Sequence, residues 1–163
     1  MILFEENTQL ELKNGVLFYN HLVFNGVLKS FDEVNQTYNV TSYLSGKKDG
    51  EERKLFQNDS LAEIRFYKEG KKVGIHKSWF ENGQQKFEYP YNQKGFYQGA
   101  LKEWFPNGQL IREFNYVEGK ESGTQKMWLE NGNIRANYTV IDGERFGLIG
   151  LKKCYSVNTN DEK

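Results

Sequence analysis

The sequence predicts an all-β protein: a single-layer antiparallel β-meander of about six β-hairpin repeats, elongated and either flat or curled. Three observations predict this fold. Pairs of glycines recur with a regular period, and Asn-Gly dipeptides fall at a fixed place within that period. The chain is also rich in aromatic residues that favour strands (12 Phe, 10 Tyr and 3 Trp), and it has 16 Gly but only 2 Pro.

Glycine pairs with the spacing G-x-x-x-G define the repeat. The second glycines are separated by 24, 25, 24 and 24 residues (50→74→99→123→147), and one period earlier Gly26 fills the same slot with Leu22 four residues before it. We expect an N-terminal segment over 1–14, a repeat array with period 24–25 over 15–150, and a C-terminal cap strand and polar tail over 151–163. The ends of repeat arrays are usually atypical because they cap an open edge.

Each period predicts one hairpin. Asn82-Gly83, Asn107-Gly108 and Asn131-Gly132 occupy the same slot of three repeats. Asn-Gly suits a type I′ turn, in which both central residues have positive φ, so this turn is predicted here. The expected outgoing strand spans 75–80 and the return strand 85–91. The G-x-x-x-G segment is then expected to make the reverse turn at the other end of the hairpin.

Alternation along the outgoing strands places two rows of side chains on one face. The third residue after each second glycine is basic and the fifth is aromatic or apolar: Lys29, Arg53, Lys77, Lys102 and Lys126 in one row, and Phe31, Leu55, Trp79, Trp104 and Trp128 in the other. The candidate binding residues are the three Lys/Trp pairs of the two rows: Lys77, Trp79, Lys102, Trp104, Lys126 and Trp128.

These rows also have a purely structural explanation. Tryptophans of successive hairpins would stack on one another, with lysines beside their rings. Glu88, Glu113 and Asn137 lie on the return strands, where they could pair with the basic row. The sequence leaves both explanations open, and it leaves open whether one apolar face closes on itself or awaits a partner.

Residues suited to catalysis are few and far apart. The chain has two histidines, His21 and His76, separated by more than two periods, and one cysteine, Cys154, within the basic stretch Lys152-Lys153-Cys154. None of these has the spacing of a zinc site, no loop matches a calcium-binding motif, and no P-loop sequence follows the glycines. We therefore expect no enzyme, no catalytic residues, no cofactor and no bound metal. For Cys154 a half-buried position in the terminal cap is favoured over a reactive thiol.

The pattern G-x-x-x-G-x-x-x-x-W-F-x-N-G-Q resembles the variant MORN (membrane occupation and recognition nexus) repeat common in bacteria. The best copies run from Gly70 to Gln84 and from Gly95 to Gln109, and a third runs from Gly119 to Gly132. The resemblance covers roughly residues 15–150. It implies an array of β-hairpins with roles in protein scaffolding or lipid contact, and an antitoxin label attached to some bacterial members. It implies no catalytic residues.

The resulting functional expectation is a non-catalytic interaction or scaffold module that binds a protein partner through the face of its sheet. The alternatives are contact with an anionic phospholipid surface through the Lys/Trp rows, or glycan binding on the tryptophans. The 22 basic and 22 acidic residues balance, so no nucleic-acid partner is expected. No apolar run is long enough to span a membrane and no signal peptide is visible. This favours a cytoplasmic location by default, or the cell envelope if a leader has been removed.

Overall fold

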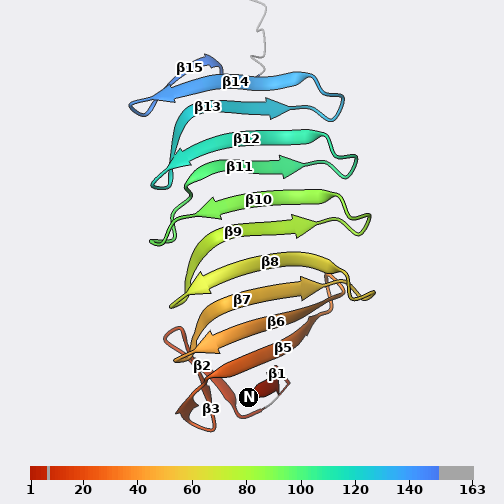
Figure 1. Ribbon diagram of the computed structural model, residues 1–163, viewed down its shortest axis with the longest axis vertical. Coiled ribbons are helices and arrows are strands. Elements are labelled where there is room, and N and C mark those ends of the chain that lie inside the picture. The colour runs from red at the N-terminus through yellow and green to blue at the C-terminus, as the bar shows by residue number, and fades with distance from the viewer. Residues whose placement is uncertain (7, 151–163) are drawn as a thin grey trace, which may run out of the picture.

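The computed structural model describes residues 1–6 and 8–150, and Figure 1 shows most of them as one long ladder of mainly antiparallel strands. The predicted cap strand over 151–163 and Cys154 lie outside the described residues. The main sheet has 12 strands in the order β1-β5-β6-β7-β8-β9-β10-β11-β12-β13-β14-β15, and a separate sheet has the order β2-β3-β4. The sheet is open, and the described residues form no helix, so the predicted all-β meander is confirmed.

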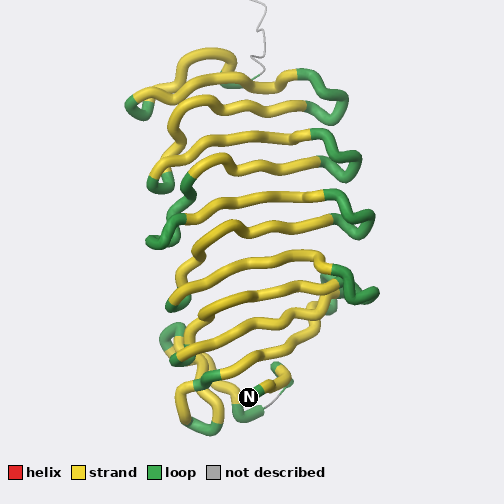
Figure 2. Tube along the Cα trace, viewed as in Figure 1, coloured by secondary structure: helices red, strands yellow, loops and turns green. Residues whose placement is uncertain are grey.

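The strands are short and joined mainly by tight turns (Figure 2). Their bounds are β1 Ile2–Phe4, β2 Leu10–Lys13, β3 Val16–Tyr19, β4 Leu22–Val23, β5 Gly26–Asp32, β6 Thr37–Leu44, β7 Lys47–Leu55, β8 Leu61–Lys68, β9 Lys71–Trp79, β10 Gln85–Tyr91, β11 Gly99–Trp104, β12 Leu110–Val117, β13 Lys120–Trp128, β14 Ile134–Ile141 and β15 Glu144–Leu148. From β5 to β15 every strand is antiparallel to the next, whereas β1 runs parallel to β5 at the N-terminal edge.

The Asn-Gly ends of the hairpins do not form the predicted type I′ turns. Only Gly83 of the Asn82-Gly83 pair has a positive φ, 81°. The Gly83 amide donates to the Phe80 carbonyl (2.9 Å), and the Phe80 amide donates to the Gln84 carbonyl (2.9 Å). This is a three-residue loop, a type I turn closed by a left-handed glycine. The Asn82 side chain instead accepts the Gln84 amide (3.0 Å), a role that needs no positive φ at asparagine.

The type I′ turns lie at the opposite ends, where the first glycine of each G-x-x-x-G segment follows a residue with positive φ. Glu69 (φ 51°) and Gly70 (φ 82°) illustrate the geometry. The exception is the link between β10 and β11, which uses a three-residue loop closed by Gly95, whose amide donates to the Asn92 carbonyl (3.0 Å). Its one additional residue explains why one repeat has 25 residues and the others 24.

The second glycine of the segment does not belong to the reverse turn, contrary to expectation. It lies in a β-bulge with two extra residues, in which three residues of the outgoing strand oppose one residue of the preceding return strand. Residues 122–124 oppose Asn115, because Phe114 pairs with Gln125 and Tyr116 pairs with Glu121. The same offset places residues 49–51 opposite Ser42 and residues 74–76 opposite Arg65. The bulges recur with the repeat, so they are part of its design.

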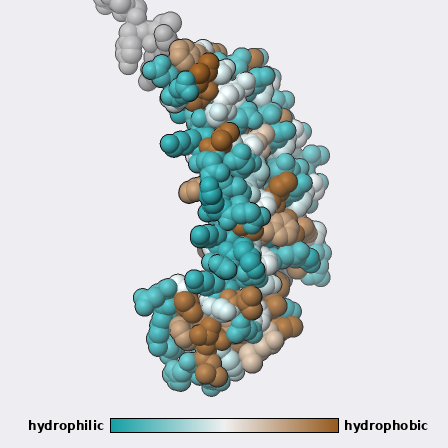
Figure 3. Space-filling view, turned by 60° about the vertical axis from the view of Figure 1, so that its left-hand side comes forward, coloured by the Kyte–Doolittle hydropathy of each residue, from teal (hydrophilic) through white to brown (hydrophobic). Residues whose placement is uncertain are grey.

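A short sheet of β2, β3 and β4 closes the N-terminal end of the ladder. The Gly46 amide donates to the Phe24 carbonyl (2.8 Å), and the Leu17 amide donates to the Gly46 carbonyl (2.8 Å). Phe24 is buried and its ring lies 5.8 Å from that of Tyr43 on the main sheet. Figure 3 shows hydrophobic side chains gathered at this end, whereas the repeats beyond it show mainly hydrophilic ones.

Candidate interaction surface

The predicted basic row exists and lies across the sheet, within what we call the lysine face. Its basic residues pair in register with residues of the neighbouring return strands, so basic residues alternate with apolar, acidic or polar ones across the sheet. The complete row is Lys29, Val40, Arg53, Ile64, Lys77, Glu88, Lys102, Glu113, Lys126 and Asn137. The lysine face is defined by this row together with the side chains at every second position from it along the same strands, which point to the same side of the sheet.

Acidic side chains neutralise the centre of the row. Lys77 Nζ lies 3.1 Å from Glu88 Oε2, and Lys102 Nζ lies 3.8 Å from Glu113 Oε1. Burial disfavours the Glu88 carboxylate, but its hydrogen bonds and the nearby lysine charges outweigh this effect and lower its pKa. The cross-strand pairing expected from the sequence is therefore present. Partly exposed pairs of this kind are each worth about 0.2–1 kcal/mol.

The predicted stack of tryptophans is not formed. In the described part of the chain, ring–ring contacts join Tyr, Phe and His, and cation–π contacts involve Tyr and Phe; none includes Trp79, Trp104 or Trp128. The tryptophans instead stand opposite non-aromatic residues, Gln85, Leu110 and Ile134, at the hairpin ends. They are half-buried. Strand twist and the register shift beside each hairpin loop account for the separation of their rings.

The continuous aromatic contact lies on the other side of the sheet, here called the tyrosine face, and sequence reasoning missed it. Rings follow one another across β8 to β12 with centroid distances of 5.7, 4.6, 4.7 and 5.3 Å, through Tyr67, His76, Tyr91, Tyr97 and Tyr116. The available signal was the recurrence of tyrosine near the C-terminal end of each return strand. The bulges decide which rings meet, so the sequence pattern alone could not assign the contacts.

Carboxylates on the tyrosine face are fully engaged in hydrogen bonds. Glu103 accepts from Tyr89 and is paired with Arg112 (2.5 Å). Glu52 accepts from Tyr67 (3.1 Å) and is paired with Lys48. Burial and the neighbouring Glu103 raise the pKa of Tyr89, so its hydroxyl stays protonated and keeps donating. These networks support the fold, because a buried carboxylate is tolerated only when it is paired.

Two buried polar side chains complete the bulges. Gln125 is fully buried; its Oε1 accepts the Asn115 amide (2.9 Å) and its Nε2 donates to the Asn115 carbonyl (2.9 Å). His76 occupies the same position two repeats earlier, two residues after Gly74. Its Nε2 lies 3.2 Å from the Phe66 amide nitrogen and 2.9 Å from the Phe66 carbonyl oxygen. Burial lowers the pKa of His76. The histidine is therefore a structural residue.

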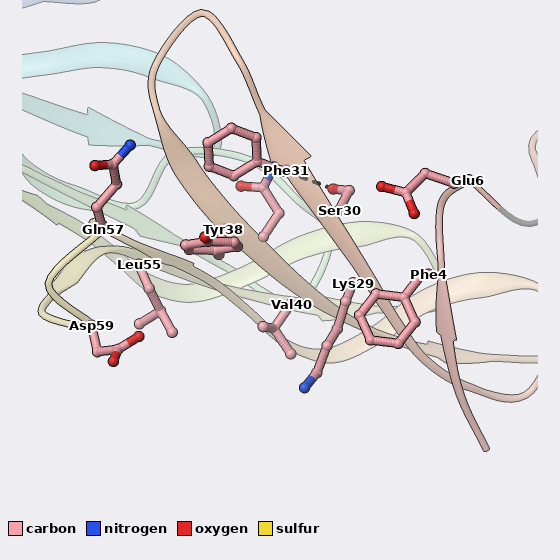
Figure 4. Close-up of a pocket in the computed structure, with 11 residues that line it drawn as sticks. Phe4, Glu6, Lys29, Ser30, Phe31, Tyr38, Val40, Leu55, Gln57 and Asp59 are labelled. Carbon is pink, nitrogen blue, oxygen red and sulfur yellow. Dashed lines mark hydrogen bonds between the residues drawn. The ribbon is translucent and has the colours of Figure 1, made fainter.

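The clearest hollow on the surface lies at the N-terminal end of the lysine face (Figure 4). It is a groove of about 680 Å³ over β5, β6 and β7, lined by Phe4, Glu6, Lys29, Ser30, Phe31, Tyr38, Asn39, Val40, Leu55, Gln57 and Asp59. The rings of Phe31 and Tyr38 lie 4.9 Å apart and are 39% and 47% exposed. The sequence placed Lys29, Phe31 and Leu55 in its two rows, but it did not show that they border one groove.

No metal-binding constellation was found among residues 1–6 and 8–150: no three His, Cys, Asp or Glu side chains come together in a suitable arrangement. His21 is exposed in the turn between β3 and β4, 3.9 Å from Glu11, whereas His76 is buried in β9. In the same part of the chain, no helix is long and apolar enough to cross a membrane.

A model of the MORN repeat variant matches the chain twice, over residues 72–93 and 97–118. Each match coincides with one hairpin, β9–β10 and β11–β12, which are the two best copies of the glycine repeat. No curated protein matches the chain. Repeats of this type are generally modules for protein or membrane-surface interaction and are not a catalytic type. Residues 72–118 thus carry two copies of the MORN repeat variant, and the recurring hairpin and its period are consistent with a MORN-repeat protein.

Proposed function

We propose that this chain is a non-catalytic interaction or scaffold module that binds a protein partner through the lysine face of its sheet. The observation that carries the proposal is the open, single-layer sheet, which in the described part of the chain has no second layer of secondary structure over the lysine face (Figure 1). This face nevertheless presents half-exposed rings and ion pairs along most of its length. Rigid faces with aromatic anchors and charged rims are typical of protein interfaces.

The charge pattern favours a protein over an anionic lipid surface. Glu88 and Glu113 compensate Lys77 and Lys102, so the centre of the row carries little net charge. Binding to anionic membranes depends on accumulated positive charge, at about 1 kcal/mol for each basic residue near the surface. An alternating row suits instead a partner with its own alternating charges, and it would provide specificity through charge complementarity.

The test compares wild type with a charge-inverted variant that keeps the ion pairs. Lys77→Glu, Glu88→Lys, Lys102→Glu and Glu113→Lys, made together, reverse the row and preserve each pair. Both proteins serve as bait in a crosslinked pull-down from the source organism, after circular dichroism has shown equal folding.

One protein that binds wild type saturably in a follow-up titration, and is lost with the inverted variant, is the expected result. A partner retained by both proteins would place the site elsewhere than on this row. Failure to enrich any partner, together with sedimentation of wild type with phosphatidylserine vesicles, would contradict the proposal.

A further inference from the structure

The groove at the N-terminal end of the lysine face contains a cation without a partner. Lys29 lies in the same row as Arg53, Lys77 and Lys102, each of which is within 4.0 Å of a carboxylate: Glu51 for Arg53, and the cross-strand glutamates for the two lysines. Among the described residues, no carboxylate lies within that distance of Lys29 or of Lys126, the fifth basic member of the row, but Lys126 is exposed whereas Lys29 is half-buried. Its cross-strand neighbours are Phe4 and Val40, both apolar. Lys29 is thus a half-buried charge set among apolar side chains.

The remaining walls of the groove make it a site for an apolar side chain. Val40 and Leu55 lie beside the rings of Phe31 and Tyr38, and Phe4, 59% exposed, stands across from them (Figure 4). By contrast, Tyr67 and Tyr138 on the tyrosine face are buried. Exposed rings that converge on one hollow mark a surface from which a ligand would remove apolar area from water.

Two carboxylates restrict what the groove accepts. Glu6 and Asp59 line it on different sides of Lys29, Glu6 following β1 and Asp59 in the loop between β7 and β8 (Figure 4). A densely anionic surface would meet both of them and is disfavoured. A single carboxylate directed at Lys29 avoids them and gains a charge-assisted hydrogen bond in a partly desolvated position.

We propose that this groove binds a short peptide segment of the partner protein, one that carries an acidic residue beside an aromatic or large aliphatic residue. The apolar side chain packs against Phe31 and Tyr38, and the carboxylate pairs with Lys29. The groove volume of about 680 Å³ suits a few side chains. This inference rests on the proposed function, since it assigns the partner's chemistry and the part of the lysine face that the partner contacts.

The test uses a displayed library of random 12-residue peptides, selected on the full chain, followed by synthesis of enriched peptides and fluorescence anisotropy. Three variants are compared with wild type: Lys29→Met, Tyr38→Ala, and the matched control Lys71→Met, which removes an exposed lysine at the start of β9, outside the groove and outside the row. Both groove side chains are partly exposed, so these variants are expected to fold.

Enriched peptides should combine Asp or Glu with a nearby aromatic or aliphatic residue. Lys29→Met and Tyr38→Ala should each weaken binding about tenfold, and Lys71→Met should leave it unchanged. Three results would overturn the inference: no enrichment, enriched peptides that bind Lys29→Met as tightly as wild type, or Lys29-dependent binding of phosphatidylserine vesicles in place of peptides. If the groove fails while the pull-down still yields a partner sensitive to the charge inversion, the proposed function stands and only the groove assignment is lost.

Discussion

Gln125 and Asn115 are joined by two hydrogen bonds of 2.9 Å, one to the Asn115 amide and one to its carbonyl. Asn115 is the single residue that faces the three-residue bulge at Gly123, so no residue of β13 is in register to satisfy its backbone. The fully buried side chain of Gln125 takes over that role. The bulge and the Gln125 side chain therefore form one structural unit. His76, at the same position after Gly74, makes corresponding contacts with the backbone of Phe66.

We expect Gln125→Ala to lower the free energy of unfolding by about 2–4 kcal/mol, because it leaves a buried amide and carbonyl without partners and removes side-chain volume. Urea denaturation followed by tryptophan fluorescence measures the change. Thr124→Ala, at the exposed neighbouring position, is the control and should stay within about 0.5 kcal/mol of wild type. Equal stability of the two variants would show that Gln125 does not support the bulge.

We expect His76 to make stability depend on pH between 7.5 and 5.5. Burial lowers its pKa from the ordinary value of 6.5, so below that value the unfolded chain binds more protons than the folded one. The free energy of unfolding should thus fall as the pH drops below about 6.5, by at most about 1.4 kcal/mol per pH unit, and level off below the lowered pKa. Above about pH 7.5 the histidine should contribute no slope, because it is then neutral in both states.

The measurement for His76 is the urea midpoint across that pH range, compared with His76→Gln. Glutamine imitates the side chain found at position 125 and has no titrating group, so its midpoint should be nearly flat over the window. Glu52, whose pKa is lowered by Lys48 against the effect of burial, loses its stabilising charge only at more acid pH. A slope that survives in His76→Gln would assign the effect to other groups.

We expect Gly46→Ala to destabilise the N-terminal sheet much more than Gly15→Ala. Both glycines have positive φ (71° and 76°), so both variants incur backbone strain of about 1–2 kcal/mol. A methyl group at Gly46 would lie 2.4 Å from Val16 Cγ1 and 2.7 Å from the Leu17 carbonyl, whereas nothing lies within 4 Å at Gly15. Hydrogen exchange of the Leu17 amide reports on the docking. Equal protection in the two variants would contradict the close packing.

We expect Asp59→Gly to stabilise the protein by about 0.5–1 kcal/mol, because Asp59 occupies the left-handed slot (φ 61°) that glycine fills in the later hairpin loops. The Asn58 side chain still accepts the Ser60 amide, so the loop type is kept. Differential scanning calorimetry measures the gain. Gly83→Asp, the reverse change, should destabilise by a similar amount, and a gain there would argue against the shared loop geometry.

Local sequence determined the repeat. Glycine spacing, the Asn-Gly dipeptides and alternation specify where each hairpin turns and which strands are neighbours. The return strand predicted at 85–91 matches β10, whereas the outgoing strand predicted at 75–80 begins four residues earlier, at Lys71, and ends at Trp79. Opposite charges at fixed offsets were sufficient to predict the Lys77–Glu88 and Lys102–Glu113 pairs. These features depend on residues within one or two hairpins, which is the range over which a repeat array is governed by its own period.

Only the tertiary structure decided the turn types, the aromatic contacts and the groove. Asn-Gly permits two turn geometries, and the choice falls on the three-residue loop at one end of the hairpin and on type I′ at the other. Bulges at the second glycines shift the register, so the rings of successive tyrosines are in contact whereas the tryptophan rings are not. The groove needs Phe4 from β1 beside Lys29 of β5, a parallel contact between segments 25 residues apart (4→29) that no local pattern encodes.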